Sequence, residues 1–449
     1  MARLPLEGIR IIDSTYIIAM PYAGGILADL GAEVIKVEGP AHTDMTRGAF
    51  LGTFPDNVLG DDWWNRAAGY NMLHRGKRSL TLDLSKEEGR DVFRELVKTS
   101  DVIMENYTPR VMRRWELDYP NLKKIKPDII LVSNTGYGHS DGPYSQYPAQ
   151  ATTQEATHGL VSLTGYQGDM PSKAGAAYVD FLASWSGLLG IASALRHRNR
   201  TGQGQWVDIG MYQMGCYFTS EYILDWTANG RNPTRIGNRH PSRAPQGCYP
   251  CSGVDQWCAI SVGDDDEWIA LCEAMDSPEL TDDPRFATPS TRMEHHDELD
   301  EIIRGWTQTL DKFEVMEQLQ SVGVPAGPVH DSKDANTSPH YWERGFLEKV
   351  DYPEERKIGS RVLMTRSWHL SKTPMPIERP APKLGEANND VLQGLLGLSE
   401  SEIAKLDESN IIAKEPANTP PPVVVSLSDQ VEQGRLAYFD PDFKAKLGI

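Results

Sequence analysis

The chain has 449 residues, which is too long for one ordinary core and fits two domains. Hydrophobic residues make up 39% and charged residues 24%, a composition typical of a folded globular chain and not of a disordered one. With 45 Lys and Arg against 63 Asp and Glu, the net charge is −18, which argues against nucleic acid or an anionic membrane as the main partner. A small phosphorylated ligand needs only a few local cations and stays compatible with this charge.

Neither a membrane span nor a secretion signal is expected. The longest nearly apolar run, 181–195, is broken by serines and is too short to cross a bilayer. Glu7, Arg10 and Asp13 interrupt the apolar residues near the N-terminus, so no signal core is expected there. The cysteines form an odd and sparse set, which indicates reduced thiols and a cytoplasmic protein. They are Cys216, Cys248, Cys251, Cys258 and Cys272.

In the first 135 residues, short apolar segments alternate with segments of helical spacing. Strands are predicted at 8–13, 32–37, 79–84, 101–104 and 128–133. Helices are predicted at 22–30 and 85–96, and the second is expected to begin at Ser85 as its cap, with Glu88 completing a capping box. Strands separated by helices indicate a parallel sheet with covering helices, so the fold class of this part is α/β.

The rest of the chain indicates a second, smaller unit. The predicted elements are a helix at 180–198, a strand at 205–210, an aromatic helical stretch at 212–226, a strand at 257–262, and helices at 268–275 and 298–310. Pro and Gly cluster from 232 to 253, which favours a domain boundary nearby. The expected division is 1–225 for the N-terminal part of a large domain, 226–330 for a small α/β domain, 331–415 for a return to the large domain, and 416–449 for a C-terminal arm or tail.

Common catalytic and cofactor motifs are missing from the sequence. It contains no G-x-G-x-x-G after the first strand, no G-x-x-x-x-G-K-[ST] and no G-x-S-x-G. Cys248-Tyr-Pro-Cys251 is a single C-x-x-C, which we interpret as ordinary loop thiols because a zinc site usually needs a second ligand pair. His295-His296 is expected on a solvated helix face. The acidic run 264–267 is expected to cap the helix near Trp268 in preference to binding a divalent metal.

Asp180 is the most interesting acidic residue. It follows Ala174-Gly-Ala-Ala-Tyr-Val179 and precedes a helical stretch of small and apolar residues with few charges nearby. On residue type alone a helix N-cap is favoured. The alternative is a partly buried carboxylate that acts as a nucleophile or base. Spacing alone does not decide between these interpretations.

Many short motifs, each weak by itself, follow one another in order to about residue 412. Among them are Pro5-Leu-Glu-Gly8, Asp44-Met-Thr-Arg47, Lys77-Arg-Ser-Leu-Thr-Leu-Asp-Leu84, Asp101-Val-Ile-Met-Glu-Asn106, Thr201-Gly-Gln-Gly-Gln205, Asp283-Pro-Arg-Phe-Ala287, Gly323-Val-Pro-Ala-Gly-Pro328 and Ala381-Pro-Lys-Leu-Gly-Glu386. In this order they resemble the class III CoA-transferases, a family that includes formyl-CoA:oxalate, carnitine and benzylsuccinate CoA-transferases and 2-methylacyl-CoA racemases.

The resemblance implies a fold, an assembly and a mechanism. The fold would be a large Rossmann-like domain, with a parallel sheet and built from both chain ends, plus a smaller α/β domain. Two subunits would interlock like linked rings, as a homodimer or with a paralogous subunit. Asp180 matches the catalytic aspartate, which would form a mixed anhydride with the acyl group of a donor such as succinyl-CoA and then an aspartyl-CoA thioester. A coenzyme A thioester is the co-substrate, and no metal or redox cofactor is required.

The same resemblance suggests contacts to CoA. The matching positions are Ile17, Lys77, Asn106 and Arg114. Two positions near Asn106 and Arg114 differ from the residues usual in the family. Thr108 replaces a basic residue that is common there, and Arg110 stands where glycine is usual. The cationic contact to a phosphate is therefore expected to have moved along the chain.

Other departures bear on the substrate. Tyr16, a candidate substrate contact, and Ile18 stand where oxalate enzymes place a histidine and a glutamine, and Ile18 cannot donate a hydrogen bond, so oxalate is disfavoured. The segment 244–248 has one glycine where the family has a glycine-rich lid. The runner-up function is a racemase, disfavoured because 148–151 lacks the usual histidine and because His139 and His158 are out of register.

Two features suggest the kind of acceptor. If aromatic residues of the stretch 207–226 face the site, they would suit a bulky acid, such as benzylsuccinate or a carnitine-like acid. Arg239 and Arg243 could clamp the second carboxylate of a dicarboxylic acid. A third possible function, beside the transferase and the racemase, is that of a non-catalytic subunit of a heteromeric transferase. The intact Asp180 favours an active chain.

Overall fold

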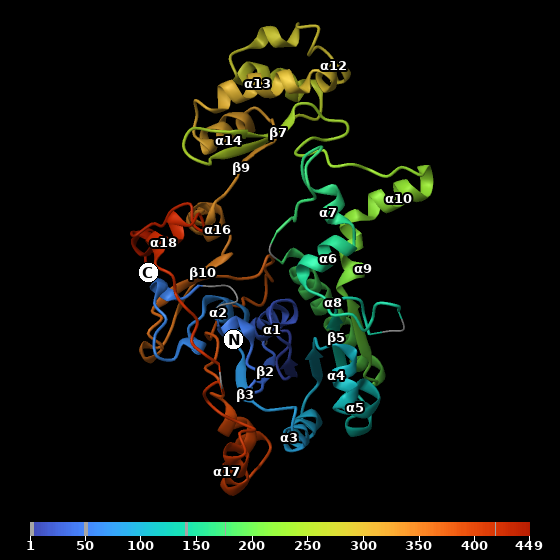
Figure 1. The fold of residues 1–449 in the computed structure, drawn as a ribbon, viewed down its shortest axis with the longest axis vertical. Coiled ribbons are helices and arrows are strands. Elements are labelled where there is room, and N and C mark those ends of the chain that lie inside the picture. Colours follow the sequence, from blue (N-terminus) through green and yellow to red (C-terminus); the bar gives the residue numbers. More distant parts are fainter. Residues whose placement is uncertain (1–3, 49–52, 140–141, 176, 418) are drawn as a thin grey trace. The chain divides into compact units, whose positions relative to one another are not determined.

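In the computed structural model, which describes residues 4–48, 53–139, 142–175, 177–417 and 419–449, the chain divides into two units. The large unit consists of Met1–Gly159, Ala174–Ile223 and Asn336–Ile449, and the small unit of Leu160–Lys173 and Leu224–Ala335. Figure 1 shows both along the chain. The segment Leu160–Lys173 belongs to the small unit, although its position in the sequence had suggested the large one.

The large unit is built on a parallel sheet, which has six strands among the described residues. In spatial order these are β3 (Arg78–Thr81), β2 (Glu33–Glu38), β1 (Arg10–Ser14), β4 (Val102–Glu105), β5 (Ile130–Thr135) and β6 (Trp206–Gly210). Each neighbouring pair is parallel. The predicted parallel α/β sheet is confirmed. The strand order reverses between β1 and β4, and ligands of open α/β sheets bind at such a point, outside the carboxyl ends of the strands.

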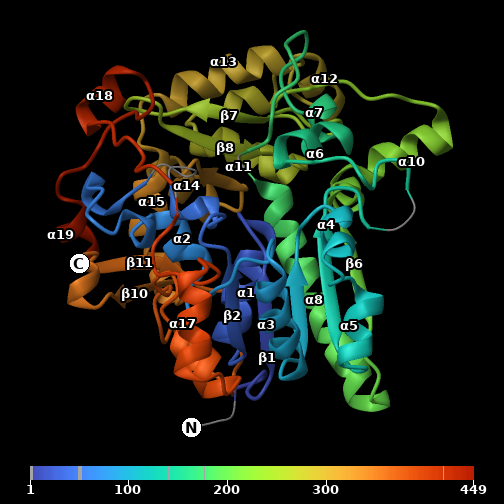
Figure 2. The same cartoon turned by 60° about the horizontal axis from the view of Figure 1, so that its bottom comes forward.

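One face of this sheet is covered by α1 (Ala19–Asp29) and α8 (Tyr178–Thr201). Successive strand residues point to opposite faces, so Ile11 and Val102 pack with the apolar side chains of these two helices. Figure 2 shows both helices alongside the strands. By length and composition α8 resembles a membrane-spanning helix, but 44% of its most apolar stretch is buried in the structure, as in the core helix of a folded domain.

The opposite face carries Ile12 and Leu131, which pack against α3 (Glu87–Lys98), α5 (Tyr119–Ile125) and α17 (Glu400–Glu408). Because α17 comes from the C-terminal part of the chain, both chain ends build the core of the large unit. The other helices and strands of this unit are α2 (Ala68–Leu73), α4 (Pro109–Arg114), α6 (Ala151–Thr157), α9 (Met211–Gly215), α16 (Pro339–Glu343), β10 (Leu347–Asp351), β11 (Ser360–Met364), α18 (Leu427–Glu432) and α19 (Phe443–Leu447).

The predicted capping box at Ser85 is wrong. Helix α3 begins at Glu87, and Lys86 occupies the N-cap position without a side-chain hydrogen bond. The hydroxyl and the N–H of Ser85 instead donate to Asp83 Oδ1, at 2.6 and 3.0 Å. Asp side chains readily accept from the backbone two residues on, and this local turn competes with a helix cap for the serine.

The small unit has an antiparallel sheet of β7 (Gln246–Pro250), β8 (Trp257–Ser261) and β9 (Ala326–Pro328). Its helices are α7 (Leu160–Leu163), α11 (Asp265–Ala274), α12 (Pro289–Glu294), α13 (His296–Thr307) and α14 (Lys312–Ser321). Two helices cross the boundary between the units along the chain, α10 (Ser220–Asn229) and α15 (Ser332–Thr337).

Two sequence predictions concern this small unit. The acidic run does cap a helix, since the Asp264 carboxylate accepts the N–H of Glu267 at the start of α11. The solvated face predicted for His295-His296 is wrong for His296, which is buried and accepts the N–H of Gln246 at 3.0 Å. The charged residues around it suggested solvent, but the helix turns His296 toward β7.

The C-terminal segment lies along the surface of the large unit. Val424 packs with the cluster that contains Phe54 and Trp63. The Asn57 side chain donates to the carbonyl of Val425 at 2.9 Å, and Lys444 forms an ion pair of 2.8 Å with Asp56. The segment is thus attached to residues 54–64 by apolar and polar contacts.

Candidate functional site

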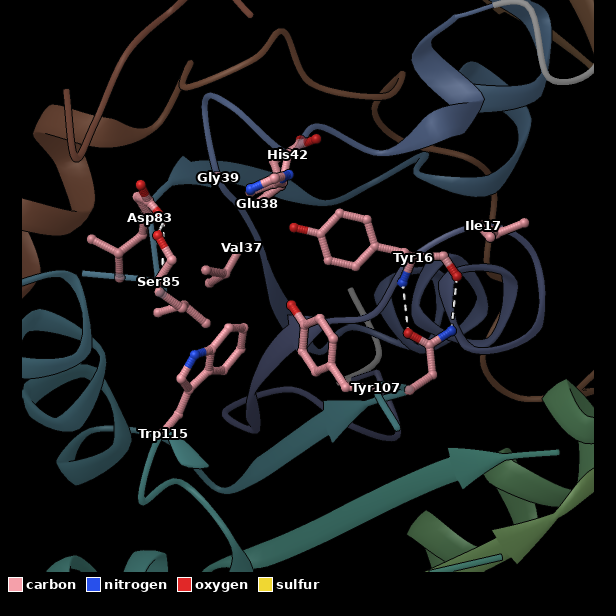
Figure 3. A pocket seen from close by; sticks show the side chains of 13 residues that line it. Tyr16, Ile17, Val37, Glu38, Gly39, His42, Asp83, Ser85, Tyr107 and Trp115 are labelled. Carbon is pink, nitrogen blue, oxygen red and sulfur yellow. Dashed lines mark hydrogen bonds between the residues drawn. The ribbon is translucent and has the colours of Figure 1, made fainter. Parts of the chain in front are cut away.

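A cavity of about 300 Å³ lies at the carboxyl ends of β1, β2, β3 and β4, at the point where the strand order reverses. Thirteen residues of the large unit line it, and Figure 3 shows their side chains. They are Tyr16, Ile17, Val37, Glu38, Gly39, His42, Leu82, Asp83, Leu84, Ser85, Asn106, Tyr107 and Trp115. Its place in the fold is that expected for a ligand of an open α/β sheet.

Aromatic rings form much of the cavity wall. The ring centroids of Tyr16 and Tyr107 lie 5.8 Å apart, and those of Tyr107 and Trp115 lie 5.2 Å apart. In Figure 3, Asp83 and Ser85 lie at the end near Trp115, and Ile17 lies at the opposite end. Aromatic walls next to hydrogen-bonding groups suit a flat heterocycle, which can stack on a ring and bond at its edge.

The turn that follows β1 forms part of the cavity and contains two of the predicted contacts. The Asn106 side chain holds both backbone groups of Tyr16: its Oδ1 accepts the Tyr16 N–H at 2.9 Å and its Nδ2 donates to the Tyr16 carbonyl at 2.8 Å. Ile17 has φ +71°, a left-handed conformation that is unusual for a β-branched residue. Tyr16, predicted as a substrate contact, is therefore brought together with Ile17 and Asn106, predicted as contacts to CoA.

Lys77, predicted as a contact to CoA, is not among the residues that line the cavity. Its ammonium group is fully buried, 2.6 Å from Asp13 Oδ2 and 2.7 Å from the carbonyl of Pro21. Burial lowers the pKa of Lys77 to about 8, and the Asp13 carboxylate opposes this shift. An enclosed, paired ammonium group does not support a direct contact with a phosphate.

The remaining predicted cation also lies outside the cavity lining. Arg114 ends α4 and is exposed, as is Arg110, whereas the next residue, Trp115, lines the cavity. No Lys or Arg belongs to the cavity lining formed by the described residues. Arg114 is next to Trp115 in the sequence, and its contact with a phosphate stays a prediction.

Asp180 lies in the first turn of α8 and is partly buried. The N-cap interpretation is wrong, because the helix begins at Tyr178 and Ala177 occupies the N-cap position. The Ser184 hydroxyl donates to the Asp180 carbonyl at 2.9 Å and also contacts the carbonyl of Ala19 at the start of α1. A carboxylate in the first turn is favourably placed at the positive end of the helix dipole, which stabilises its charged form.

The start of α8 packs against the segment that leaves the cavity turn. Ala177 belongs to the same apolar cluster as Ile17 and Ile18. Aromatic rings belong to this cluster or pack against it. The ring centroids of Tyr22 and Phe181 lie 5.2 Å apart, and those of Trp185 and Trp368 lie 5.0 Å apart, in T-shaped contacts. Asp180 is thus carried by a helix whose first turns lie beside Ile17 and Ile18, within a largely apolar environment.

The two histidines considered for proton transfer are both buried and partnered. His139 Nε2 lies 3.3 Å from Glu105 Oε1, and its Nδ1 lies 3.7 Å from Asp208 Oδ1. His158 Nε2 is 2.7 Å from the hydroxyl of Tyr178, two residues before Asp180. The sequence separation of 20 residues between His158 and Tyr178 concealed this imidazole–phenol pair at the start of α8.

The small unit holds the two arginines considered for an acceptor carboxylate. Arg239 pairs with Asp297 at 2.6 Å and with Asp300 at 2.5 Å. It borders an open groove of about 640 Å³ together with Gln246. Arg243 is exposed, and its guanidinium donates to Ser261 Oγ at 3.4 Å. Both arginines have protein partners, so the clamp remains a prediction.

Sequence reasoning missed most of the cavity wall. Tyr107 and Trp115 carried no signal as isolated aromatic residues, and Asp83 and Ser85 were assigned to a strand end and a helix cap. The available signal was topological: residues that directly follow β1, β2 and β4 meet at one edge of a parallel sheet. Tyr16, Gly39 and Asn106 occupy such positions.

Comparison with known proteins gives a consistent result. The family model described as CoA-transferase family III matches residues 6–388. The chain is 34% identical to succinyl-CoA–D-citramalate CoA-transferase of Chloroflexus aurantiacus, over 91% of this chain and 98% of the relative. It is 32% identical to the beta subunit of succinyl-CoA–L-malate CoA-transferase of the same organism, over 91% and 98%. A crystal structure of a CAIB/BAIF family protein from Brucella suis matches with a TM-score of 0.78 and 33% identity, over 88% of this chain and 100% of that one.

The chain therefore belongs to CoA-transferase family III. The resemblance inferred from the order of the motifs is confirmed, as is the α/β fold, and the protein is a CoA-transferase that uses a CoA thioester as co-substrate.

Proposed function

We propose that this CoA-transferase moves CoA from succinyl-CoA to a dicarboxylic acid, with Asp180 as the covalent nucleophile. The observation that carries the proposal is the position of Asp180, in the first turn of a helix that packs against the turn lining the cavity. The donor is inferred from two relatives whose names specify succinyl-CoA, with citramalate or malate as the second substrate. Both of these are dicarboxylic acids.

The chemistry follows from a carboxylate nucleophile. A carboxylate oxygen of Asp180 attacks the thioester carbonyl, the C–S bond breaks, and a mixed anhydride and CoA thiolate result. The thiolate then attacks the Asp180 carbonyl, which releases succinate and leaves an aspartyl-CoA thioester. The acceptor carboxylate attacks that thioester and forms a second anhydride, from which the thiolate takes the acyl group. One carboxylate enters and one leaves, so the cycle needs no net proton transfer and no metal or redox cofactor.

The cavity is proposed to hold the nucleotide end of CoA. The adenine would stack on the rings of Tyr107 or Trp115, and the pantetheine arm would pass Ile17 toward Asp180. Tyr16 and Asn106 shape this path through the backbone of the turn. Arg114, exposed beside Trp115, is the proposed phosphate contact in place of the buried Lys77.

The apolar environment of Asp180 favours a mechanism without bulk water. A water molecule that attacks the anhydride or the aspartyl thioester would hydrolyse it and waste the thioester. The cluster of Ile18, Phe181 and Trp185 surrounds the start of α8 with apolar groups. Ile18 offers no hydrogen bond to the acceptor, so the second carboxylate of a dicarboxylic acid needs another partner, for which Arg239 and Arg243 remain candidates.

The assembly is proposed to be an interlocked dimer of two copies or of this chain and a paralogue. Large hydrophobic side chains are exposed along residues 217–226, as expected for a surface that a second subunit covers. They are Tyr217, Phe218, Ile223, Leu224 and Trp226. We expect Leu224→Glu to lower the mass measured by analytical ultracentrifugation, whereas Val254→Glu, at an exposed residue of the small unit, leaves it unchanged. A monomeric wild-type chain would refute the dimer.

The free thiols of all five cysteines agree with the proposed cytoplasmic location.

Mass spectrometry tests the covalent mechanism directly. The purified chain is incubated with succinyl-CoA alone, then digested, with Asp180→Asn as the inactive variant and Asp169→Asn, an exposed residue, as the matched control. We expect a CoA-sized adduct on the peptide that contains Asp180, released by hydroxylamine, in the wild type and in Asp169→Asn but not in Asp180→Asn. If no adduct forms and deuterium from D₂O enters the α-position of an acyl-CoA, the protein is a racemase, with the His158–Tyr178 pair as its second acid/base candidate.

A further inference from the structure

The turn after β1 holds a conformation that its residues do not favour. Ile17 has φ +71°, and a β-branched side chain is rarely found in the left-handed region because its Cβ substituents crowd the backbone. Such conformations persist only where the surrounding structure imposes them, and they cluster at ligand sites. Ile17 lines the cavity and packs with Ala177 at the start of α8, so its conformation affects both parts of the proposed site.

Three side chains from neighbouring segments form hydrogen bonds with the backbone of the turn. Asn106 binds both the N–H and the carbonyl of Tyr16. The buried ammonium group of Lys36 donates to the carbonyl of Thr15. The carboxylate of Asp44 faces the N–H of Ile17, with both oxygens 3.3 Å from the nitrogen. Of these three side chains, Asp44 is the one that binds the backbone of the left-handed residue itself.

Asp44 is held firmly in place. It is buried, and its Oδ1 accepts the N–H of Thr46 at 3.0 Å and the Thr46 hydroxyl at 2.7 Å. Its Oδ2 lies 3.4 Å from Lys36 Nζ and 3.5 Å from His74 Nε2. Burial raises the pKa of Asp44, but the Lys36 charge and the hydrogen bond from His74 outweigh it and hold the pKa far below its usual range. A charged acceptor, held by several partners, thus faces the Ile17 amide.

We propose that Asp44 is a positioning residue for CoA transfer, which holds Ile17 in its left-handed conformation so that the turn fits the acyl-CoA and the start of α8. The carboxylate does not line the cavity, so it acts through the backbone of Ile17. This inference rests on the proposed function, because it assumes that the cavity and Asp180 act on one CoA thioester.

A double-mutant cycle between residues 44 and 17 tests the inference. Asp44→Asn removes the charge but keeps the size of the side chain. Loss of a charge-assisted hydrogen bond predicts a rise of roughly tenfold in KM for succinyl-CoA, with kcat changed less. In an Ile17→Gly background, where glycine adopts positive φ without strain, the same substitution is expected to raise KM by less than about threefold. The matched control is Thr46→Val, which removes another hydrogen bond of Asp44 and leaves the Ile17 contact in place.

The outcomes separate this inference from the proposed function. If Asp44→Asn raises KM equally in both backgrounds, Asp44 acts through general stability and the inference is refuted. If wild-type protein neither binds CoA by calorimetry nor forms the Asp180 adduct, the proposed function itself fails, and the positioning role with it. If Asp44→Asn does not fold, Ile17→Ala and Ile17→Gly are compared. The glycine variant is expected to show the lower KM, because alanine retains the Cβ that opposes positive φ, and equal KM values would refute the role of the turn.

Discussion

Replacing Asn106 by Ala is expected to weaken both the fold and the binding of CoA thioesters. The side chain makes two hydrogen bonds, of 2.9 and 2.8 Å, to the N–H and the carbonyl of Tyr16. Each buried backbone group left without a partner costs about 1–3 kcal/mol, so the loss in the free energy of unfolding is expected to be about 2–6 kcal/mol. This is a large part of the roughly 5–15 kcal/mol that stabilises a typical domain.

Urea unfolding followed by tryptophan fluorescence measures the stability, and steady-state kinetics with succinyl-CoA measures KM. Asn106→Asp separates the two hydrogen bonds, because a carboxylate can accept the Tyr16 N–H but cannot donate to its carbonyl. Asn121→Ala is the control, since Asn121 bonds only to side chains of its own helix region, Asp118 and Lys124. A loss below about 1 kcal/mol for Asn106→Ala, with unchanged KM, would show that the turn does not depend on this clamp.

Three other predictions test the site. Asp180→Asn is expected to lower kcat by more than about 10³-fold while CoA binding, measured by calorimetry, persists. Trp115→Ala is expected to raise KM for succinyl-CoA by about 5- to 150-fold, because stacking of a base on an aromatic ring contributes about 1–3 kcal/mol. The KM for succinyl-pantetheine, which lacks the nucleotide, is expected to stay unchanged. Burial lowers the pKa of His74 to about 4, so the folded protein binds this proton less readily than the unfolded chain. The resulting stability is present above about pH 6.5 and is lost as pH falls toward 4. Between pH 7.5 and 5, the free energy of unfolding of His74→Gln, measured by urea unfolding, is therefore expected to fall by about 2 kcal/mol less than that of the wild type.

Each of these expectations has a contrary outcome. Residual turnover of Asp180→Asn within tenfold of the wild type would exclude the covalent mechanism. Equal effects of Trp115→Ala on both thioesters would place the nucleotide elsewhere, and Trp257→Ala, in the small unit, controls for nonspecific loss. An unchanged pH dependence in His74→Gln would mean that His74 titrates alike in the folded and unfolded protein.

The sequence also predicted the wrong environment for several residues, and each error has the same physical origin. Ser85 was assigned to a helix cap and His296 to a solvated face, because local spacing and neighbouring charges were the only guides. In the structure Ser85 bonds to Asp83, and His296 bonds to the backbone of β7, 50 residues away. Lys77 was assigned to a contact with CoA, but its ammonium group is paired with Asp13, which lies 64 residues away in the chain.

What the sequence determined by itself was the class of fold, the family and the candidate nucleophile. Alternating strand and helix patterns indicate a parallel sheet, because neighbouring parallel strands need a crossover connection and a helix usually supplies it. The order of short motifs then identified the family and placed Asp180 at the start of a helix. Local periodicity and motif order are properties of neighbouring residues, so they can be read along the chain.

Only the tertiary structure decided how these residues combine. The cavity joins Tyr16, Val37, Leu82 and Tyr107, which come from four different strand ends and share no sequence pattern. The left-handed turn at Ile17 and the carboxylate of Asp44 below it depend on pairings across 27 residues. Parallel strands bring their carboxyl ends to one edge of the sheet whatever their separation in the chain, so the contacts that form the site become visible only once the sheet has formed.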